Sequence, residues 1–176
     1  MSVNIRRGVP SDAGALAVLA AITFPLATTP ATEQAEIDRH VEAELSEHRF
    51  AGFLADPSRH LWVAEVAGEL VGYTMLVEGE PEDPAVIGAI TARPTVELGK
   101  FYVHPDHHGL GIAGRLMDEV VRAGRSAGAA SLWLGVSDEN ARANRFYEKH
   151  GFVIVGAKQF RIGDRFENDH VRELVL

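Results

Sequence analysis

The pattern of the amino-acid sequence predicts a single α/β (α+β) domain over residues 1–176. About seven strands form a mixed, mostly antiparallel twisted sheet, and about four helices flank it. The length of 176 residues is that of one compact domain with room for a sizeable core. Segments with helical and with strand periodicity alternate along the chain, and no linker or repeat divides them. Hairpins toward both ends flank this alternating middle, which indicates helices packed on the faces of one sheet.

The first third of the chain is predicted to contain one strand and two helices. Val3–Arg6 has the strand pattern, and Ser11 and Asp12 are suited to cap the helix that follows. Residues 25–32, which include two prolines, interrupt that helix. A second, amphipathic helix then has acidic residues around one stripe, which consists of Ile37, Val41, Leu45 and His48.

Strands predominate in the rest of the chain, with helices between them. The strands are predicted at His60–Val66, Leu70–Glu78, Thr95–Val103, Ser131–Val136, Phe152–Val155 and Val171–Leu176. One helix begins at Ile112 and another occupies Asn140–His150, where Gly151 stands in the position that favours glycine after a helix. The acidic segment Glu78–Pro84 is expected to be a solvated loop, and a turn is expected near Gly163.

Composition argues against several classes of function. The formal net charge of −8 disfavours nucleic acid as a partner and suits a cationic substrate such as an amine, although acidic surfaces also serve solubility. The chain has no cysteine, so disulfides, thiolate metal sites and a cysteine nucleophile are excluded, which fits a cytoplasmic location. No apolar run is expected to approach the length that spans a membrane, and the N-terminus lacks the apolar core of a secretory signal.

The most informative segment joins the strand Thr95–Val103 to the helix that begins at Ile112. Its glycines, Gly109, Gly111 and Gly114, allow the backbone to approach a ligand closely. The first N–H groups of a helix have no partner within the helix, and with the helix dipole they favour a bound anion such as a pyrophosphate. Taken alone, the pattern fits a phosphate-binding turn and a tight structural turn equally well.

The segment His108-Gly109-Leu110-Gly111-Ile112-Ala113 resembles motif A of the GNAT superfamily of N-acetyltransferases, which reads Gln/Arg-x-x-Gly-x-Gly/Ala. His108 departs from the first position of the motif, where the family's side chain helps to order the turn. Backbone N–H groups bind the pyrophosphate in this family, so the departure weakens the resemblance little.

A second motif supports the first. Asn140, Ala143 and Tyr147 have the spacing of the family's motif B, Asn-x-x-Ala-x-x-x-Tyr, and Gly151-Phe152 follows in place. At positions i, i+3 and i+7 the three residues share one face of a helix. Two motifs in the right order imply the GNAT fold, with acetyl-CoA as the cosubstrate.

The resemblance implies a coenzyme site made largely of backbone groups. Phe101, Tyr102 and Val103 would bind the pantetheine arm in the manner of an added strand. Asn140 would hydrogen-bond the same arm, and Lys149 is a candidate partner for a coenzyme phosphate or, equally, a solvated lysine at a helix C-terminus. The residues expected around the pyrophosphate are His108, Gly109, Leu110, Gly111, Ile112, Ala113 and Gly114.

Tyr147 is the candidate general acid. When an amine attacks the thioester, coenzyme A leaves as a thiolate that a nearby hydroxyl can protonate. A phenol with a pKa of about 10 can donate to a thiolate whose conjugate acid has a pKa of about 8.5. The alternative is a core tyrosine that anchors its helix.

The amine must lose a proton before it attacks, which at pH 7 costs roughly 4–5 kcal/mol for a pKa of about 10.4. Glu97 is the candidate base, because several relatives carry an acid on this strand; a salt-bridged or edge glutamate is the alternative. Simple alternation would place Glu97 on the strand face that holds Phe101 and Val103. The backbone N–H of Val103 is expected to stabilise the oxyanion.

The acceptor is the least determined part of the function. The acidic second helix and a loose likeness of the C-terminal segment to polyamine acetyltransferases favour a polyamine-like amine, with a protein N-terminus or lysine second. A solvated acidic face is the alternative. In this superfamily the acceptor lies between the first two helices and the strands beyond motif B.

Other partners and functions carry less weight. His104, Asp106, His107 and His108 lie in one loop without a distant partner, so no metal is expected. A homodimer through strand edges would be typical of the superfamily. The rival function is a coenzyme-binding regulatory module that has lost catalysis.

Overall fold

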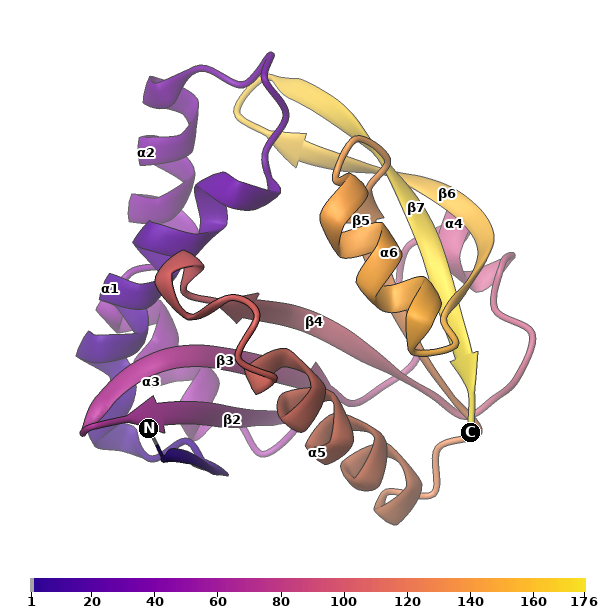
Figure 1. Ribbon diagram of the computed structural model, residues 1–176. Helices are drawn as coiled ribbons and strands as arrows, with labels where there is room; N and C mark the ends of the chain where they lie inside the picture. The colour runs from indigo at the N-terminus through magenta and orange to yellow at the C-terminus, as the bar shows by residue number, and fades with distance from the viewer. Residues whose placement is uncertain (1) are drawn as a thin grey trace.

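The computed structural model describes residues 2–176, and this part of the chain contains seven strands and six α-helices (Figure 1). The strands are β1 (Val3–Arg7), β2 (Arg59–Val66), β3 (Glu69–Val77), β4 (Thr95–Val103), β5 (Ser131–Ser137), β6 (Val153–Ile162) and β7 (Arg165–Val175). The helices are α1 (Ala13–Thr23), α2 (Gln34–Glu44), α3 (Glu47–Ala55), α4 (Pro84–Ile87), α5 (Ile112–Ser126) and α6 (Ala141–Lys149).

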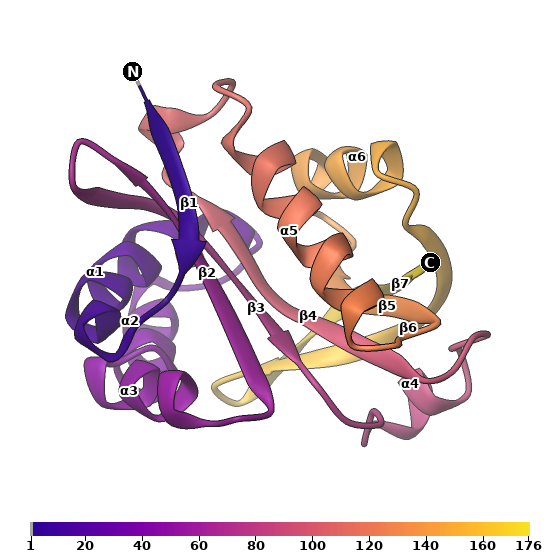
Figure 2. The same cartoon turned by 90° about the horizontal axis from the view of Figure 1, so that it is seen from below.

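All seven strands form one sheet in the order β1-β2-β3-β4-β5-β7-β6. Neighbouring strands are antiparallel except β4 and β5, which run parallel. Helices α1, α2 and α3 cover one face of the sheet, and α5 and α6 lie on the other (Figure 2). The predicted α/β class with a mostly antiparallel sheet is therefore confirmed, with two helices more than expected.

The two additional helices have local causes. The predicted second helix is divided into α2 and α3, because the Ser46 side chain accepts a hydrogen bond from the Arg49 N–H at 3.2 Å and starts a new helix. Helix α4 lies directly after the segment predicted to be a loop, and Asp83 caps it by accepting from the Ala85 N–H at 2.9 Å. Strands β6 and β7 are also longer than predicted and extend to the turn at Gly163.

Helix α1 lies in a long apolar stretch of the chain. The helical stretch Pro10–Ala27, with a mean hydropathy of 1.4, is long and apolar enough by composition alone to cross a membrane. The expectation that no run approaches this length was therefore wrong. In the fold, Leu16, Leu19 and Ala20 of this stretch are buried in the core that α1 forms with the sheet.

A bulge at Gly99 interrupts the alternation of β4. Leu98 and Lys100 pair with two consecutive residues of β3, so Gly99 between them has no partner of its own. An extra residue of this kind exchanges the two faces of a strand. Leu98 and Phe101 therefore both pack toward α5, although three positions separate them, and Glu97 lies on the opposite face with Lys100. The prediction that Glu97 shares a face with Phe101 and Val103 was wrong for this reason.

Candidate active site

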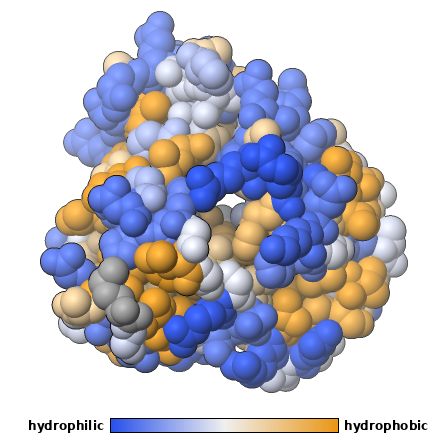
Figure 3. All heavy atoms as spheres, in the orientation of Figure 1, coloured by the Kyte–Doolittle hydropathy of each residue, from blue (hydrophilic) through white to orange (hydrophobic). Residues whose placement is uncertain are grey.

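The sheet opens between its two parallel strands. β4 and β5 pair only at Thr95–Glu97 and Ser131–Trp133; beyond these residues β4 pairs with β3 and β5 with β7. Figure 1 shows β4 running away from the part of the fold that contains β5, β7 and α6. The surface is hollowed over β4, beside α6, in the same orientation (Figure 3). The opening begins directly after Glu97.

The edge of β4 along this opening has free backbone groups. The His104 N–H donates to β3 at 2.7 Å. Hydrogen-bonding residues alternate along an antiparallel ladder, so Tyr102 and Lys100 also direct their backbone groups to β3. Phe101 and Val103 therefore direct theirs toward the opening, where the Val103 carbonyl oxygen is already bonded to His108. Of the three residues expected to bind the pantetheine arm, Phe101 and Val103 have backbone groups at this edge and Tyr102 does not.

The histidines after β4 stabilise their own loop. Nε2 of His108 lies 2.8 Å from the Val103 carbonyl oxygen, so this nitrogen carries the proton that it donates. Nδ1 of His104 accepts a hydrogen bond from the Asp106 N–H at 3.1 Å. Within residues 2–176, no group of three or more His, Asp or Glu side chains is arranged to hold a metal ion. His108 thus orders the turn, as the first residue of the motif is expected to do.

The glycines of the turn have two different roles. Gly109 and Gly111 have φ angles of 82° and 77°, in the left-handed region that favours glycine, and Gly111 is the N-cap of α5. Gly114 has no such backbone constraint, and a Cβ placed there would meet no atom within 4 Å. Glycine inside a helix costs roughly 1 kcal/mol relative to alanine. Packing does not explain Gly114, whereas a ligand at the N-terminus of α5 would use the space.

Tyr147 lies beside the free edge of β4. Its ring centroid is 6.2 Å from that of Phe101 and 5.8 Å from that of Phe152. Within residues 2–176 its hydroxyl has no hydrogen-bond partner, and unlike the Tyr73 hydroxyl it is not sealed from solvent. Burial raises the pKa of Tyr147 above its ordinary value, so the phenol keeps its proton at neutral pH and is a weaker acid than an exposed phenol.

Asn140 and Lys149 stand at the two ends of α6. Oδ1 of Asn140 accepts from the Ala143 N–H at 3.2 Å, which makes Asn140 the N-cap and leaves its amide NH₂ without a partner in residues 2–176. Lys149 is exposed in the last turn of α6, where the helix dipole favours a cation. It forms no ion pair in the described part of the chain.

The residues that hold α6 in place were not predicted from the sequence. Nδ2 of Asn144 donates to the carbonyl oxygens of Ser137 and Asn140, at 2.9 Å each, and its Oδ1 accepts from Nε of Arg172 at 3.0 Å. Arg172 is only 5% exposed and also donates to the Phe152 carbonyl oxygen at 2.8 Å. No local pattern reveals this network, because Arg172 comes from β7 at the end of the chain.

Charged side chains gather on the other face of the opening. Glu97 and Lys100 are half-buried there, and Nζ of Lys158 on β6 lies 3.8 Å from Oδ2 of Asp169 on β7. A Cβ placed on Gly135 of β5 would lie 2.5 Å from Cε of Lys158 and 3.2 Å from Oδ2 of Asp169. This ion pair therefore rests against β5, beside the opening. Of these four charged residues, only Glu97 was predicted to take part in the reaction.

Burial moves the titration of this face toward the uncharged forms. It raises the pKa of Glu97, lowers the pKa of Lys100 and raises the pKa of Asp169 to about 6. In each case the loss of hydration outweighs the attraction of the nearby opposite charges. A carboxylate with a raised pKa is a better proton acceptor near neutral pH, which suits Glu97 to the role of base.

Helix α2 is tied to the β6–β7 hairpin across this charged face. Arg165 of β7 donates to the Glu36 carboxylate at 2.9 Å, and the ring of His40 lies 5.7 Å from that of Phe160 on β6. The structure thus joins α2 to the hairpin, two segments that were expected to hold the acceptor.

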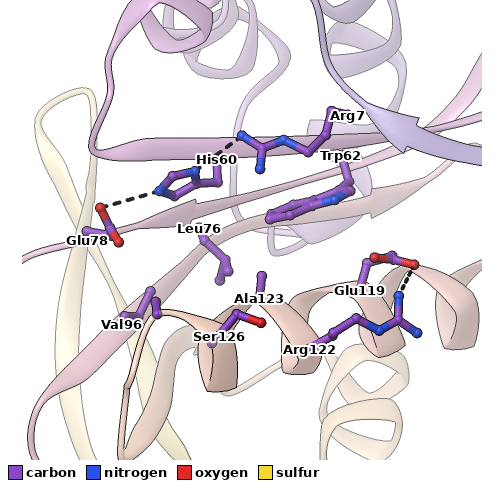
Figure 4. Close-up of a pocket in the computed structure, with 12 residues that line it drawn as sticks. Arg7, His60, Trp62, Leu76, Glu78, Val96, Glu119, Arg122, Ala123 and Ser126 are labelled. Carbon is purple, nitrogen blue, oxygen red and sulfur yellow. Dashed lines mark hydrogen bonds and ion pairs between the residues drawn. The ribbon is translucent and has the colours of Figure 1, made fainter.

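A pocket of about 350 Å³ lies away from this site, between the second half of α5 and strands β2, β3 and β4 (Figure 4). The Arg7 guanidinium lies 4.6 Å above the Trp62 ring, and Nδ1 of His60 is 3.2 Å from a nitrogen of Arg7. Nε2 of His60 is 3.4 Å from the Glu78 carboxylate. Because the glycine turn is at the other end of α5, this pocket is separate from the candidate active site.

Comparison with known proteins gives consistent matches. The sequence model of the acetyltransferase (GNAT) family matches residues 26–152. An uncharacterised N-acetyltransferase of Mycobacterium tuberculosis is 45% identical over 167 residues, which are 94% of this chain and 99% of the relative. Thialysine N-ε-acetyltransferase of Bos taurus is 28% identical over 72% of this chain and 74% of its own length. The structure of the PaiA N-acetyltransferase from Thermoplasma acidophilum in complex with coenzyme A has a TM-score of 0.79 over the whole of both chains; at 19% identity this likeness concerns the fold.

Proposed function

The chain belongs to the GNAT family of acetyltransferases, and on this basis we propose that it transfers an acetyl group directly from acetyl-CoA to a primary amine. The observation that carries the proposal is the opening of the sheet after Glu97. One side of the opening has free backbone groups, a glycine turn and the Tyr147 hydroxyl; the other has the Glu97 carboxylate.

The residues present fit the coenzyme. The N–H groups at the start of α5, over the space left by Gly114, would hold the pyrophosphate. The backbone groups of Phe101 and the amide of Asn140 would bind the pantetheine arm, and Lys149 would pair with a phosphate. The Val103 carbonyl oxygen already accepts from His108, which leaves the Val103 N–H for the reacting group. Together these contacts would place the thioester in the opening, between Tyr147 and Glu97.

Three groups of the chain would then act on the reacting atoms. Glu97 would accept the proton that the amine must lose before its nitrogen bonds to the carbonyl carbon. The Val103 N–H would stabilise the negative charge that develops on the carbonyl oxygen. Tyr147 would donate its hydroxyl proton to the sulfur as the carbon–sulfur bond breaks. The products are the N-acetylated amine and free coenzyme A.

The acceptor class rests on charge. The net charge of −8 favours a cationic amine, and a polyamine-like amine or a protein N-terminus or lysine agrees with the acidic second helix. The nitrogen acceptor in the name of the bovine relative, thialysine N-ε, supports an amine as well. The cytoplasmic location and a strand-edge homodimer stay predictions.

The proposal is tested by mixing the purified protein with acetyl-CoA and a panel of amines and measuring free thiol. We expect at least one amine to release thiol well above the rate without acceptor. A coenzyme-induced rise of the melting temperature is measured in parallel. If coenzyme A raises the melting temperature while no amine releases thiol, the chain is a coenzyme-binding module and the proposal is wrong.

A further inference from the structure

We propose that the acceptor is a zwitterion, an α-amino acid or a similar small amino carboxylate, whose amine faces Glu97 and whose carboxylate faces Lys100. The inference rests on the proposed function and narrows its acceptor class. It follows from the charges that the acceptor face of the opening leaves without partners.

Glu97 and Lys100 form a separated pair of opposite charges. Because of the bulge at Gly99 they lie on the same face of β4, on either side of the point where the sheet opens. Both are half-buried, and within residues 2–176 neither forms an ion pair, with each other or with another residue. Burying unpaired charges is unfavourable, so each is stabilised by a ligand group of opposite sign. An amino carboxylate has both groups, a few ångströms apart.

The surroundings of Lys100 favour an anion. Its Nζ lies 5.5 Å from the centroid of the Phe53 ring, and the Arg59 guanidinium lies 4.9 Å from the same ring. Arg59 is also 3.3 Å from the Asp56 carboxylate, and the Glu44 carboxylate is held by Arg49 at 3.1 Å. The Asp56 and Glu44 carboxylates of the helical layer are thus paired with arginines, and Lys100 forms no ion pair within residues 2–176.

An ion pair stands on the opposite arm of the opening. Lys158 and Asp169 pair with each other against Gly135. When all four side chains are ionised, Glu97 and Asp169 balance Lys100 and Lys158, although the whole chain has a net charge of −8. A polyamine would bring a second cation toward Lys100 and Lys158, where like charges repel. A zwitterion meets no such repulsion, which favours it over the polyamine.

The test compares acceptors that differ only in the carboxylate. The wild-type protein is assayed by thiol release from acetyl-CoA with the twenty amino acids, and the best of them is compared with its carboxamide and its decarboxylated amine, and with spermidine. We expect kcat/KM to fall about 10- to 100-fold when the carboxylate is removed, as for the loss of a hydrogen bond between charged groups. Lys100→Met should lower kcat/KM for the amino acid by a similar factor and leave the carboxamide nearly unchanged. Arg122→Met, an exposed arginine on α5 away from the opening, is the matched control.

Two results would overturn the inference while the proposed function stands. The first is found with the wild-type protein alone: the carboxamide, the decarboxylated amine or spermidine is acetylated at least as efficiently as the best amino acid. The other is an equal loss for all acceptors in Lys100→Met, with coenzyme affinity and melting temperature retained, because that loss would not depend on the carboxylate. If no acceptor in the panel causes thiol release, the proposed function is overturned as well.

Discussion

The two faces of the opening between β4 and β5 are built on different principles. Toward α5 and α6, the face consists of packed apolar and aromatic side chains, and its polar groups are uncharged: backbone groups, the Asn140 amide and the Tyr147 hydroxyl. Toward α1, α2 and α3, the face holds Glu97, Lys100 and the Lys158–Asp169 pair. One bulged strand, β4, contributes to both.

The two faces contribute differently to the stability of the fold. The coenzyme face is part of the main core, so it stabilises the fold with or without a ligand. On the acceptor face, burial shifts the pKa values of Glu97, Lys100 and Asp169 toward their uncharged forms, so this face loses stability to keep charges near the opening. Substitutions on the two faces should therefore differ in kind.

Tyr147→Phe, on the coenzyme face, should have the largest effect on turnover and leave coenzyme binding nearly unchanged. We expect kcat to fall about 10²- to 10⁴-fold, the usual contribution of a positioned acid, with little change in the Kd for coenzyme A because the ring still packs. Steady-state kinetics and calorimetric binding measure the two. Tyr73→Phe, which removes a buried hydroxyl without a partner, is the control. Undiminished turnover in Tyr147→Phe would exclude Tyr147 as the acid.

Glu97→Gln should have the next largest effect, on the acceptor face. We expect a loss of about 10² in kcat/KM at pH 7. Because burial raises the pKa of Glu97, the active carboxylate form is lost as pH falls through that raised value, and the rising limb of the pH–rate profile reports it. The limb should disappear in the variant and persist in Glu69→Gln, an exposed residue on β3. An unchanged limb would assign the base to another group or to water.

Asp169→Asn tests the cost of charge on the acceptor face. The pKa of Asp169 is raised from 3.8 to about 6 in the folded protein, so the folded state binds this proton more tightly than the unfolded state. Asp169 therefore lowers the free energy of unfolding as pH rises from 4 to 6. Relative to wild type, the variant should gain about 2–3 kcal/mol between pH 4 and 7 in urea unfolding. Asp164→Asn, in the exposed hairpin turn, is the control. If the free energy of unfolding changes with pH in the same way in Asp169→Asn and in the wild type, the raised pKa of Asp169 is contradicted.

Gly114→Ala should have the smallest effect and separate stability from coenzyme binding. A Cβ here meets no protein atom, so the free energy of unfolding should rise by about 0.5–1 kcal/mol. The methyl group would occupy the space over the N-terminus of α5, and we expect the Kd for coenzyme A to rise about tenfold, equivalent to about 1.4 kcal/mol. Gly52→Ala in α3 also meets no atom and should give the same stabilisation with an unchanged Kd. Equal coenzyme affinity in both variants would show that the space is not used.

The sequence predicted the sheet better than the helices between its strands. All seven strands were found, because each alternates in polarity or is continuously apolar over its length. The break between α2 and α3 depends on a single cap, Ser46, within an otherwise amphipathic stretch, so periodicity did not reveal it. On the coenzyme face, the positions of the glycine turn, Asn140 and Tyr147 followed from spacing, since they belong to two short segments.

Local patterns in the sequence thus determined the turn before α5, the position of α6 and the candidate acid, because each depends on residues a few positions apart. Only the tertiary structure decided which side of the sheet Glu97 occupies, because the bulge at Gly99 shifts the alternation by one residue. The tertiary structure also brought Lys100 of β4 and the Lys158–Asp169 pair of β6 and β7 to the same opening, where burial without full pairing shifts their pKa values. Contacts between strands so distant in sequence, and the loss of hydration that accompanies them, leave no pattern in a single segment.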